Sequence, residues 1–174
     1  MSAEERLLRE LRGFLRGRTL VVGVGNALRG DDGAGPAVVA GLAAQWPEAC
    51  LDAGAAPENY LDSILQRKPE RVLFVDAVDF GGRPGEARLC DWEEMRRYAW
   101  DTHRLPLRVL AEYLKAEGGV ETRVLGIQAG KVEFGAPVSA EVAEGVRIVT
   151  EAITRALSGG SACCTEAKAA WTER

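Results

Sequence analysis

Short runs of apolar residues alternate along the chain with longer segments in which apolar residues recur every three or four positions. The short runs are rich in β-branched residues and are bounded by glycine, proline or charged residues, which is typical of buried strands. We expect strands at residues 19–25, 49–52, 71–79, 85–90 and 121–128. The segments with helical periodicity predict helices at residues 35–46, 57–68, 105–118 and 139–157. An amphipathic helix is expected before the first strand, because one face of it gathers Leu7, Leu8, Leu11, Phe14 and Leu15.

This alternation of strands and helices predicts a single-domain α/β fold. We expect a twisted, mostly parallel sheet with helices on both faces. The link at residues 81–85, GGRPG, is too short for a helical crossover, which favours an antiparallel strand at 85–90. The domain is expected to span residues 1–158, and residues 159–174, which lack periodicity, are expected to form a mobile tail.

Composition and charge narrow the possible partners. The 174 residues are 47% hydrophobic, enough for one well-packed core. A net charge of −4 and an isoelectric point near 5.2 argue against a nucleic-acid surface and favour a protein or small-molecule partner. The N-terminal segment lacks the apolar core of a secretion signal, and no run approaches the roughly 20 apolar residues of a membrane span. We therefore expect a cytoplasmic protein that does not contact a membrane.

The cysteines offer no recognisable chemistry. Cys50, Cys90, Cys163 and Cys164 show neither CxxC spacing nor a disulfide-dense pattern. We interpret them as buried or incidental thiols. None lies at a strand-to-helix position suited to a cysteine nucleophile paired with a histidine.

The glycine-rich segment GNALRGDDGAGPAVV, residues 25–39, poses a question about its ligand. Such turns before helices usually bind phosphate, but the carboxylates of Asp31 and Asp32 would repel it. The turn has the first two glycines of a dinucleotide fingerprint, with Leu28 at the third position. Asp52 could serve as the ribose-binding acid, so a dinucleotide-binding oxidoreductase stays as an alternative.

Three residues are candidates for a metal site. Asp32 follows the first strand, Asp76 closes the run VLFVD, and His103, the single histidine, precedes a helix. Two carboxylates and one imidazole at one sheet edge would suit zinc, nickel, iron or manganese with open positions for water or substrate. Each residue also has a structural explanation. Asp32 could be an acid that stabilises the start of a helix, Asp76 could cap a turn, and His103 could be a structural histidine. A proton-sharing aspartic dyad is a further alternative, although the D-T/S-G loops of aspartic proteases are missing.

Five ordered segments of the chain resemble the nickel–iron hydrogenase maturation endopeptidases. They are GVGNALRGDDGAGP, LDAGAAPEN, VLFVDAVDFGGRPGEARL, THRLPL and VLGIQ, and the likeness runs from Thr19 to Leu157. The APEN, THRLPL and LGIQ segments are most similar to the branch that processes the formate-hydrogenlyase type of hydrogenase.

The resemblance implies a function for the three candidate residues. Family members cut a C-terminal extension from the precursor of the hydrogenase large subunit after nickel has been inserted. Their metal-binding and catalytic positions match Asp32, Asp76 and His103, the first being Glu in some relatives. The implied cofactor is nickel supplied by the substrate, with no organic cofactor. The alternative is a nickel-dependent binding module or chaperone that recognises the large subunit without cleaving it.

Overall fold

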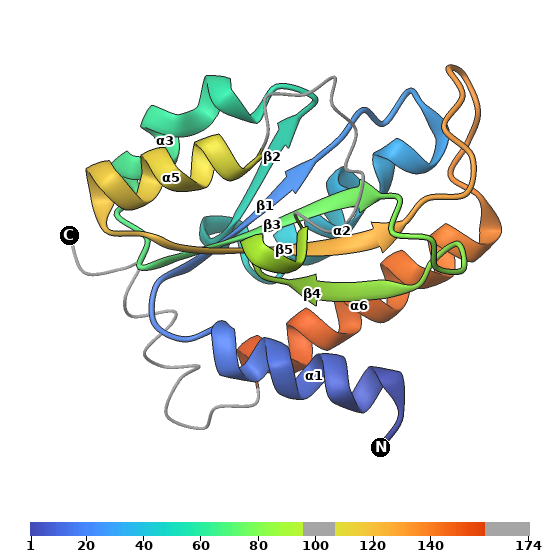
Figure 1. Cartoon of the computed structure of the whole chain (residues 1–174), viewed down its shortest axis with the longest axis horizontal. Helices are drawn as coiled ribbons and strands as arrows, with labels where there is room; N and C mark the ends of the chain where they lie inside the picture. Colours follow the sequence, from blue (N-terminus) through green and yellow to red (C-terminus); the bar gives the residue numbers. More distant parts are fainter. Residues whose placement is uncertain (96–106, 159–174) are drawn as a thin grey trace.

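The computed structural model describes residues 1–95 and 107–158, and Figure 1 shows a sheet at the centre of the molecule. The strands are β1 (Thr19–Val24), β2 (Cys50–Gly54), β3 (Arg71–Val78), β4 (Ala87–Cys90) and β5 (Glu121–Gln128). Their order is β2-β1-β3-β5-β4, with β4 antiparallel to β5 and the other pairs parallel. The predicted α/β fold and its antiparallel strand are confirmed. The predicted tail at 159–174 lies outside the described residues.

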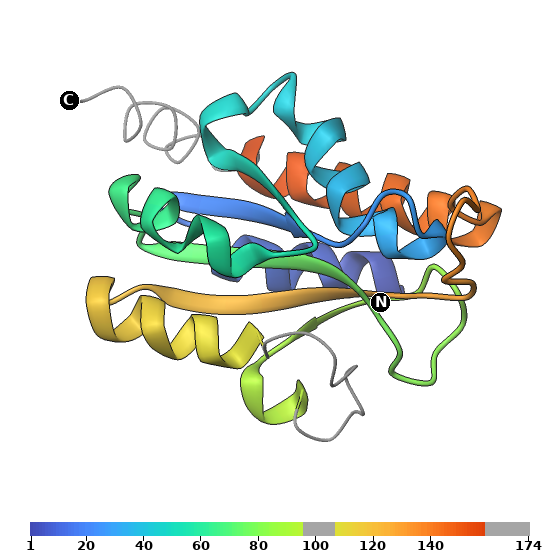
Figure 2. The ribbon, with the colours of Figure 1, turned by 90° about the horizontal axis from the view of Figure 1, so that it is seen from above.

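Helices cover both faces of the sheet, as expected (Figure 2). One face carries α1 (Ala3–Phe14), α2 (Ala34–Ala43) and α6 (Ala140–Ser158). The other carries α3 (Leu61–Gln66) and α5 (Leu107–Gly118). Short α4 (Trp92–Met95) and the 3-10 turns η1 (Gly30–Gly33), η2 (Pro47–Ala49) and η3 (Pro57–Tyr60) complete the described elements. Among the helices of residues 1–95 and 107–158, none is long and apolar enough to cross a membrane.

The central strands have apolar side chains on both faces because both faces are covered. In β3, Leu73 and Val75 belong to the core beneath α1, α2 and α6, whereas Val72 and Phe74 belong to the core beneath α3 and α5. All four are fully buried. This explains why β3 is a nearly continuous hydrophobic run instead of an alternating one.

Two element boundaries differ from the predictions. The helix expected at 57–68 is divided into η3 and the shorter α3. Strand β3 ends at Val78, one residue before the predicted end, and Asp76 lies inside it. Both differences concern element ends, which local sequence patterns specify weakly.

Helix α2 lies directly on the sheet because glycine permits the approach. A Cβ atom on Gly35 would lie 2.3 Å from the carbonyl oxygens of both Val24 and Val75. Any larger residue would push α2 away from β1 and β3. Gly35 therefore sets the position of the β1–α2 connection relative to the sheet.

Two loops meet at the carboxyl edge of the sheet, and we call residues 25–33 and 129–139 the paired loops. Backbone hydrogen bonds join them: Gly30 N donates to Ala136 O (3.1 Å), Asp31 N to Lys131 O (2.9 Å) and Gly135 N to Leu28 O (2.8 Å). Figures 1 and 2 both show the loops side by side at the end to which β3 and β5 point.

The carboxylate of Asp31 is the centre of the paired loops. It is fully buried, and it accepts hydrogen bonds from the backbone N–H groups of Gly130 (2.8 Å), Lys131 (2.7 Å) and Ser139 (2.7 Å) and from the Ser139 hydroxyl (3.0 Å). Burial raises the pKa of Asp31, but the hydrogen bonds from Lys131, Ser139 and Gly130 outweigh it and hold the pKa below its ordinary value. Asp31 is thus a buried, ionised group that stabilises the loop pair.

We predict that Asp31→Asn destabilises the fold. The amide offers one acceptor oxygen and directs its NH₂ group at backbone donors, so the expected loss in unfolding free energy is about 3 kcal/mol at neutral pH. Urea unfolding measures it. The matched control is Asp52→Asn, because Asp52 is exposed and accepts a single hydrogen bond from Gly54 N; its expected change is within about 0.5 kcal/mol.

The effect of Asp31→Asn depends on pH in a defined direction. Because the folded-state pKa of Asp31 is lowered, its carboxylate contributes stability above the unfolded-state pKa, about 3.9. That contribution is lost as the pH falls through the lower folded-state pKa. The stability difference between wild type and Asp31→Asn should therefore narrow below about pH 3.9, and a difference that widens in acid would contradict this role.

Candidate functional site

The carboxyl edge between β1 and β3 is the expected place for a site in this topology. The chain crosses from β1 to its neighbour β2 on one side of β1. On the other side of β1 lies β3, and the next strand across the sheet is β5. The connections therefore diverge at the carboxyl ends of β1 and β3, where open α/β sheets bind ligands. Asp32 and Asp76 both lie at this edge.

Asp32 belongs to η1, in the connection between β1 and α2. Its exposed fraction is 6%, and its Oδ2 accepts a hydrogen bond of 2.8 Å from Asn26 N. Gly25 makes this turn possible with a φ of +138°, and a Cβ there would lie 1.9 Å from Asp32 O. The turn that leaves β1 thus folds back over Asp32 and orients its carboxylate.

Asp76 projects from β3 just beyond the last residue that pairs with β1. The β1–β3 register ends at Gly23 opposite Val75, while Asp76 still pairs with Gly126 of β5. Its exposed fraction is also 6%. Since neighbouring side chains alternate, Asp76 lies on the same face as Val72 and Phe74, the face covered by α3 and α5.

His103, the third predicted ligand, lies outside the described residues. In the sequence it stands shortly before α5, which begins at Leu107. Helix α5 covers the same face of the sheet as the one on which Asp76 lies. Within residues 1–95 and 107–158, no three metal-ligating side chains form a cluster. The structure therefore places Asp32 and Asp76 at one edge, and the three-residue set stays a prediction.

Gln128 supports this edge, although sequence analysis did not assign it a role. It is buried at the end of β5, and its Oε1 accepts from Phe80 N (2.9 Å) and Gly82 N (3.0 Å). Its Nε2 donates to Asp79 Oδ1 (3.1 Å) and to the Ala129 carbonyl (2.9 Å). A single amide thus fixes the loop that leaves β3 beyond Asp76. A glutamine that ends a hydrophobic strand is the only sequence signal for this role.

Asp31 was the other residue whose role the sequence left open. Its neighbour in the fold, Ser139, directly precedes α6, and the Ser139 hydroxyl donates to Asp31. No local pattern indicates this contact, because the two residues are separated by 108 positions.

The glycines of the turn are explained by contacts within the chain. A Cβ on Gly25, the second glycine of the fingerprint, would lie 1.9 Å from Asp32 O, and one on Gly23, the first, would lie 2.7 Å from Gly35 O. The space that a dinucleotide fingerprint leaves for pyrophosphate is therefore filled by the protein's own backbone. This geometry disfavours the dinucleotide alternative.

The described cysteines are poorly suited to nucleophilic catalysis. Cys50 and Cys90 are buried and lie at the start of β2 and the end of antiparallel β4, away from the carboxyl edge. Burial raises the pKa of each thiol to about 11. Both are therefore thiols at neutral pH, as expected for structural cysteines. Cys163 and Cys164 lie outside the described residues.

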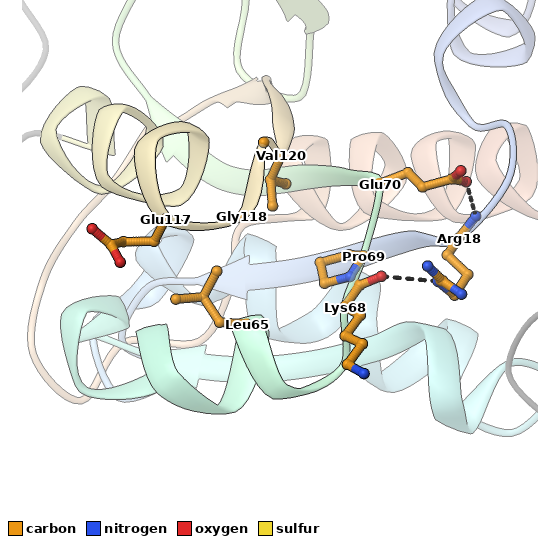
Figure 3. Close-up of a pocket in the computed structure, with 9 residues that line it drawn as sticks. Arg18, Leu65, Lys68, Pro69, Glu70, Glu117, Gly118 and Val120 are labelled. Atoms are coloured by element: carbon orange, nitrogen blue, oxygen red, sulfur yellow. Dashed lines mark hydrogen bonds between the residues drawn. The ribbon is translucent and has the colours of Figure 1, made fainter. Parts of the chain in front are cut away.

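A surface pocket of about 480 Å³ lies at the opposite, amino edge of the sheet (Figure 3). Its lining includes Arg18, Lys68, Glu70 and Val120, which precede β1, β3 and β5. Arg18 N donates to Glu70 Oε2 and Arg18 Nε donates to the Lys68 carbonyl, both at 2.8 Å. These contacts join the strand entrances, and the pocket is remote from Asp32 and Asp76.

Comparisons with known proteins agree with this architecture. Residues 36–156, which include Asp76 and His103, match the model of the HycI hydrogenase maturation protease family. The chain is 39% identical over 131 residues to the hydrogenase 3 maturation protease of Escherichia coli K12, covering 72% of this chain and 82% of that protein.

Solved structures show the same likeness. The [NiFe] hydrogenase maturation protease HycI from Thermococcus kodakarensis superposes with a TM-score of 0.78 at 33% identity, over 86% of this chain and 99% of that one. The endopeptidase HycI from Escherichia coli has a TM-score of 0.70 at 35% identity, over 79% and 90% of the two chains. The family match, the relatives and the shared fold together show that this chain is an endopeptidase that belongs to the hydrogenase maturation protease family.

Proposed function

We propose that this endopeptidase removes a C-terminal extension from the precursor of a nickel–iron hydrogenase large subunit after nickel has been inserted. One observation carries the proposal: in a chain of this family, two nearly buried carboxylates, Asp32 and Asp76, lie at the edge where β1 and β3 diverge. We infer further that the protein acts in the cytoplasm, where the precursor would be assembled.

The donor set fits nickel carried by the substrate. Asp32 and Asp76 offer carboxylate oxygens, and His103 adds an imidazole nitrogen, a combination suited to a divalent first-row metal with open coordination positions. Nickel already bound to the precursor would hold the adjacent peptide bond and polarise its carbonyl. Without a thiolate, the set is only moderately tight, which agrees with a metal that arrives with the precursor.

The residues of the chain supply orientation and a base. The Asn26 N–H fixes the Asp32 carboxylate, and pairing with β5 fixes the backbone of Asp76. Either carboxylate can take the proton of the attacking water, provided that it faces the scissile bond. Holding the precursor in one orientation favours a single cut near its C-terminus.

A nickel-dependent binding module that does not cut is the competing function. Membership of a protease family disfavours it. Intact mass of the precursor after incubation distinguishes the two, because the binding module leaves the mass unchanged.

We predict that Asp76→Asn lowers the cleavage rate by about 100-fold or more, since the amide preserves shape and removes the ligand charge. Intact mass spectrometry of the nickel-loaded precursor over time measures the rate, and circular dichroism checks the fold. Asp62→Asn is the matched control, because Asp62 is exposed on α3. Cleavage by Asp76→Asn at the wild-type rate would move the role to another residue.

His103→Ala should likewise stop processing and leave the thermal unfolding transition of the described domain unchanged. The reason is that a ligand contributes an imidazole nitrogen to the metal and little to packing. Added imidazole should restore part of the cleavage if His103 is a ligand. Full activity of His103→Ala without imidazole would exclude that role.

The origin of the metal gives a further prediction. The isolated protein should purify largely free of nickel, measured by elemental analysis, and should leave nickel-free precursor intact. Loading the same precursor with nickel should permit one cut near its C-terminus. Equal cleavage of loaded and unloaded precursor would refute the substrate-borne metal, and cleavage of neither would favour the binding module.

A further inference from the structure

Three large apolar side chains project into solvent from the paired loops. The exposed fractions are 63% for Leu28, 43% for Val132 and 78% for Phe134. We call these three residues the apolar rim. A single exposed apolar residue needs no explanation, whereas three on two hydrogen-bonded loops are a candidate interaction surface.

The apolar rim is held outward by ordered backbone. Leu28 N donates to Asn26 Oδ1 (2.9 Å), and the Leu28 carbonyl accepts from Gly135 N (2.8 Å). Gly135, directly after Phe134, has a φ of +78°, and Ala136 N closes the turn on Glu133 O (3.2 Å). These bonds fix the loop backbone, so Phe134 stays exposed although burial would stabilise it.

The apolar rim lies on the same hydrogen-bonded loops as Asp32. Leu28 lies two positions after Asn26, whose N–H holds the Asp32 carboxylate, and Val132 follows Lys131, whose N–H binds Asp31. Exposed charged side chains adjoin the rim at Arg29 and at the Lys131–Glu133 ion pair of 3.2 Å. The three residues of the apolar rim are therefore bordered by charged residues, and apolar residues bordered by charged ones are typical of a protein-binding surface.

We propose that the apolar rim docks an apolar segment of the hydrogenase large-subunit precursor and so delivers the scissile bond to Asp32 and Asp76. This inference rests on the proposed function and names the surface by which that substrate is recognised. The position of the rim at the carboxyl edge, on the loops that hold Asp32, selects the precursor as occupant. A second copy of this chain seated on the same loops would cover the edge that the substrate must reach.

The test measures binding separately from cleavage by using the nickel-free precursor. Wild type, Phe134→Ala and Tyr113→Ala are titrated with it by calorimetry, and its intact mass is recorded afterwards. Tyr113 is the matched control because it is an aromatic residue, 41% exposed, on α5. Removal of Phe134 should weaken binding about tenfold or more, from the lost apolar burial, whereas Tyr113→Ala should bind like wild type.

A second measurement uses the nickel-loaded precursor. Phe134→Ala should raise KM by about the same factor as Kd, and saturating precursor should restore most of the rate. Thermal unfolding checks that Phe134→Ala is folded, as its high exposure leads us to expect.

Each outcome bears on the proposal. Equal affinities of all three proteins, equal losses in both variants, or no binding by wild type would overturn it. If wild type were a dimer, and Phe134→Ala dissociated the dimer without changing the affinity for the precursor, the rim would serve self-association. That outcome would also overturn the proposal. Binding that depends on Phe134 without any cleavage of loaded precursor would uphold the docking surface and refute the proposed proteolysis.

Discussion

The buried charge of Asp31 is the constraint on which the functional edge depends. An ionised group withdrawn from water must be fully hydrogen-bonded, and all four donors to this carboxylate belong to residues 130–139, on the far loop. Separation of the paired loops would therefore cost Asp31 these four hydrogen bonds. Adjacent aspartates have different tasks as a result: Asp31 holds the loops together, and Asp32 takes its position from them.

Close packing extends this constraint to the sheet. Because α2 lies against the carbonyl groups of Val24 and Val75 at Gly35, the connection containing Asp32 is held at a fixed height above β1 and β3. Asp76 is part of β3 itself, and Gln128 fixes the loop beyond it. The two carboxylates thus come from different parts of the fold: Asp32 from a loop held by close packing at Gly35, and Asp76 from a strand whose following loop is hydrogen-bonded to Gln128.

The features predictable from sequence were those encoded locally. Hydrophobic runs identified every strand of the sheet, and the short GGRPG link identified the antiparallel one. The edge position of Asp32 and Asp76 followed from strand polarity.

The role of Asp31 could not be predicted, because its partners are about 100 positions away and are mostly backbone N–H groups, which leave no trace in residue type. His103 lies outside the described residues, so its place rests on sequence and on the family resemblance.

The proposed function also explains why two acids share this edge. Carboxylate oxygens together with an imidazole nitrogen are ligands that suit a divalent first-row metal. Under the proposed function, a precursor that carries nickel would gain binding energy at Asp32 and Asp76 that an unloaded precursor lacks. The apolar rim makes no such distinction, because its contacts depend on the polypeptide alone. If both proposals hold, the rim selects the protein and the carboxylates select its metal content, so that cleavage requires both.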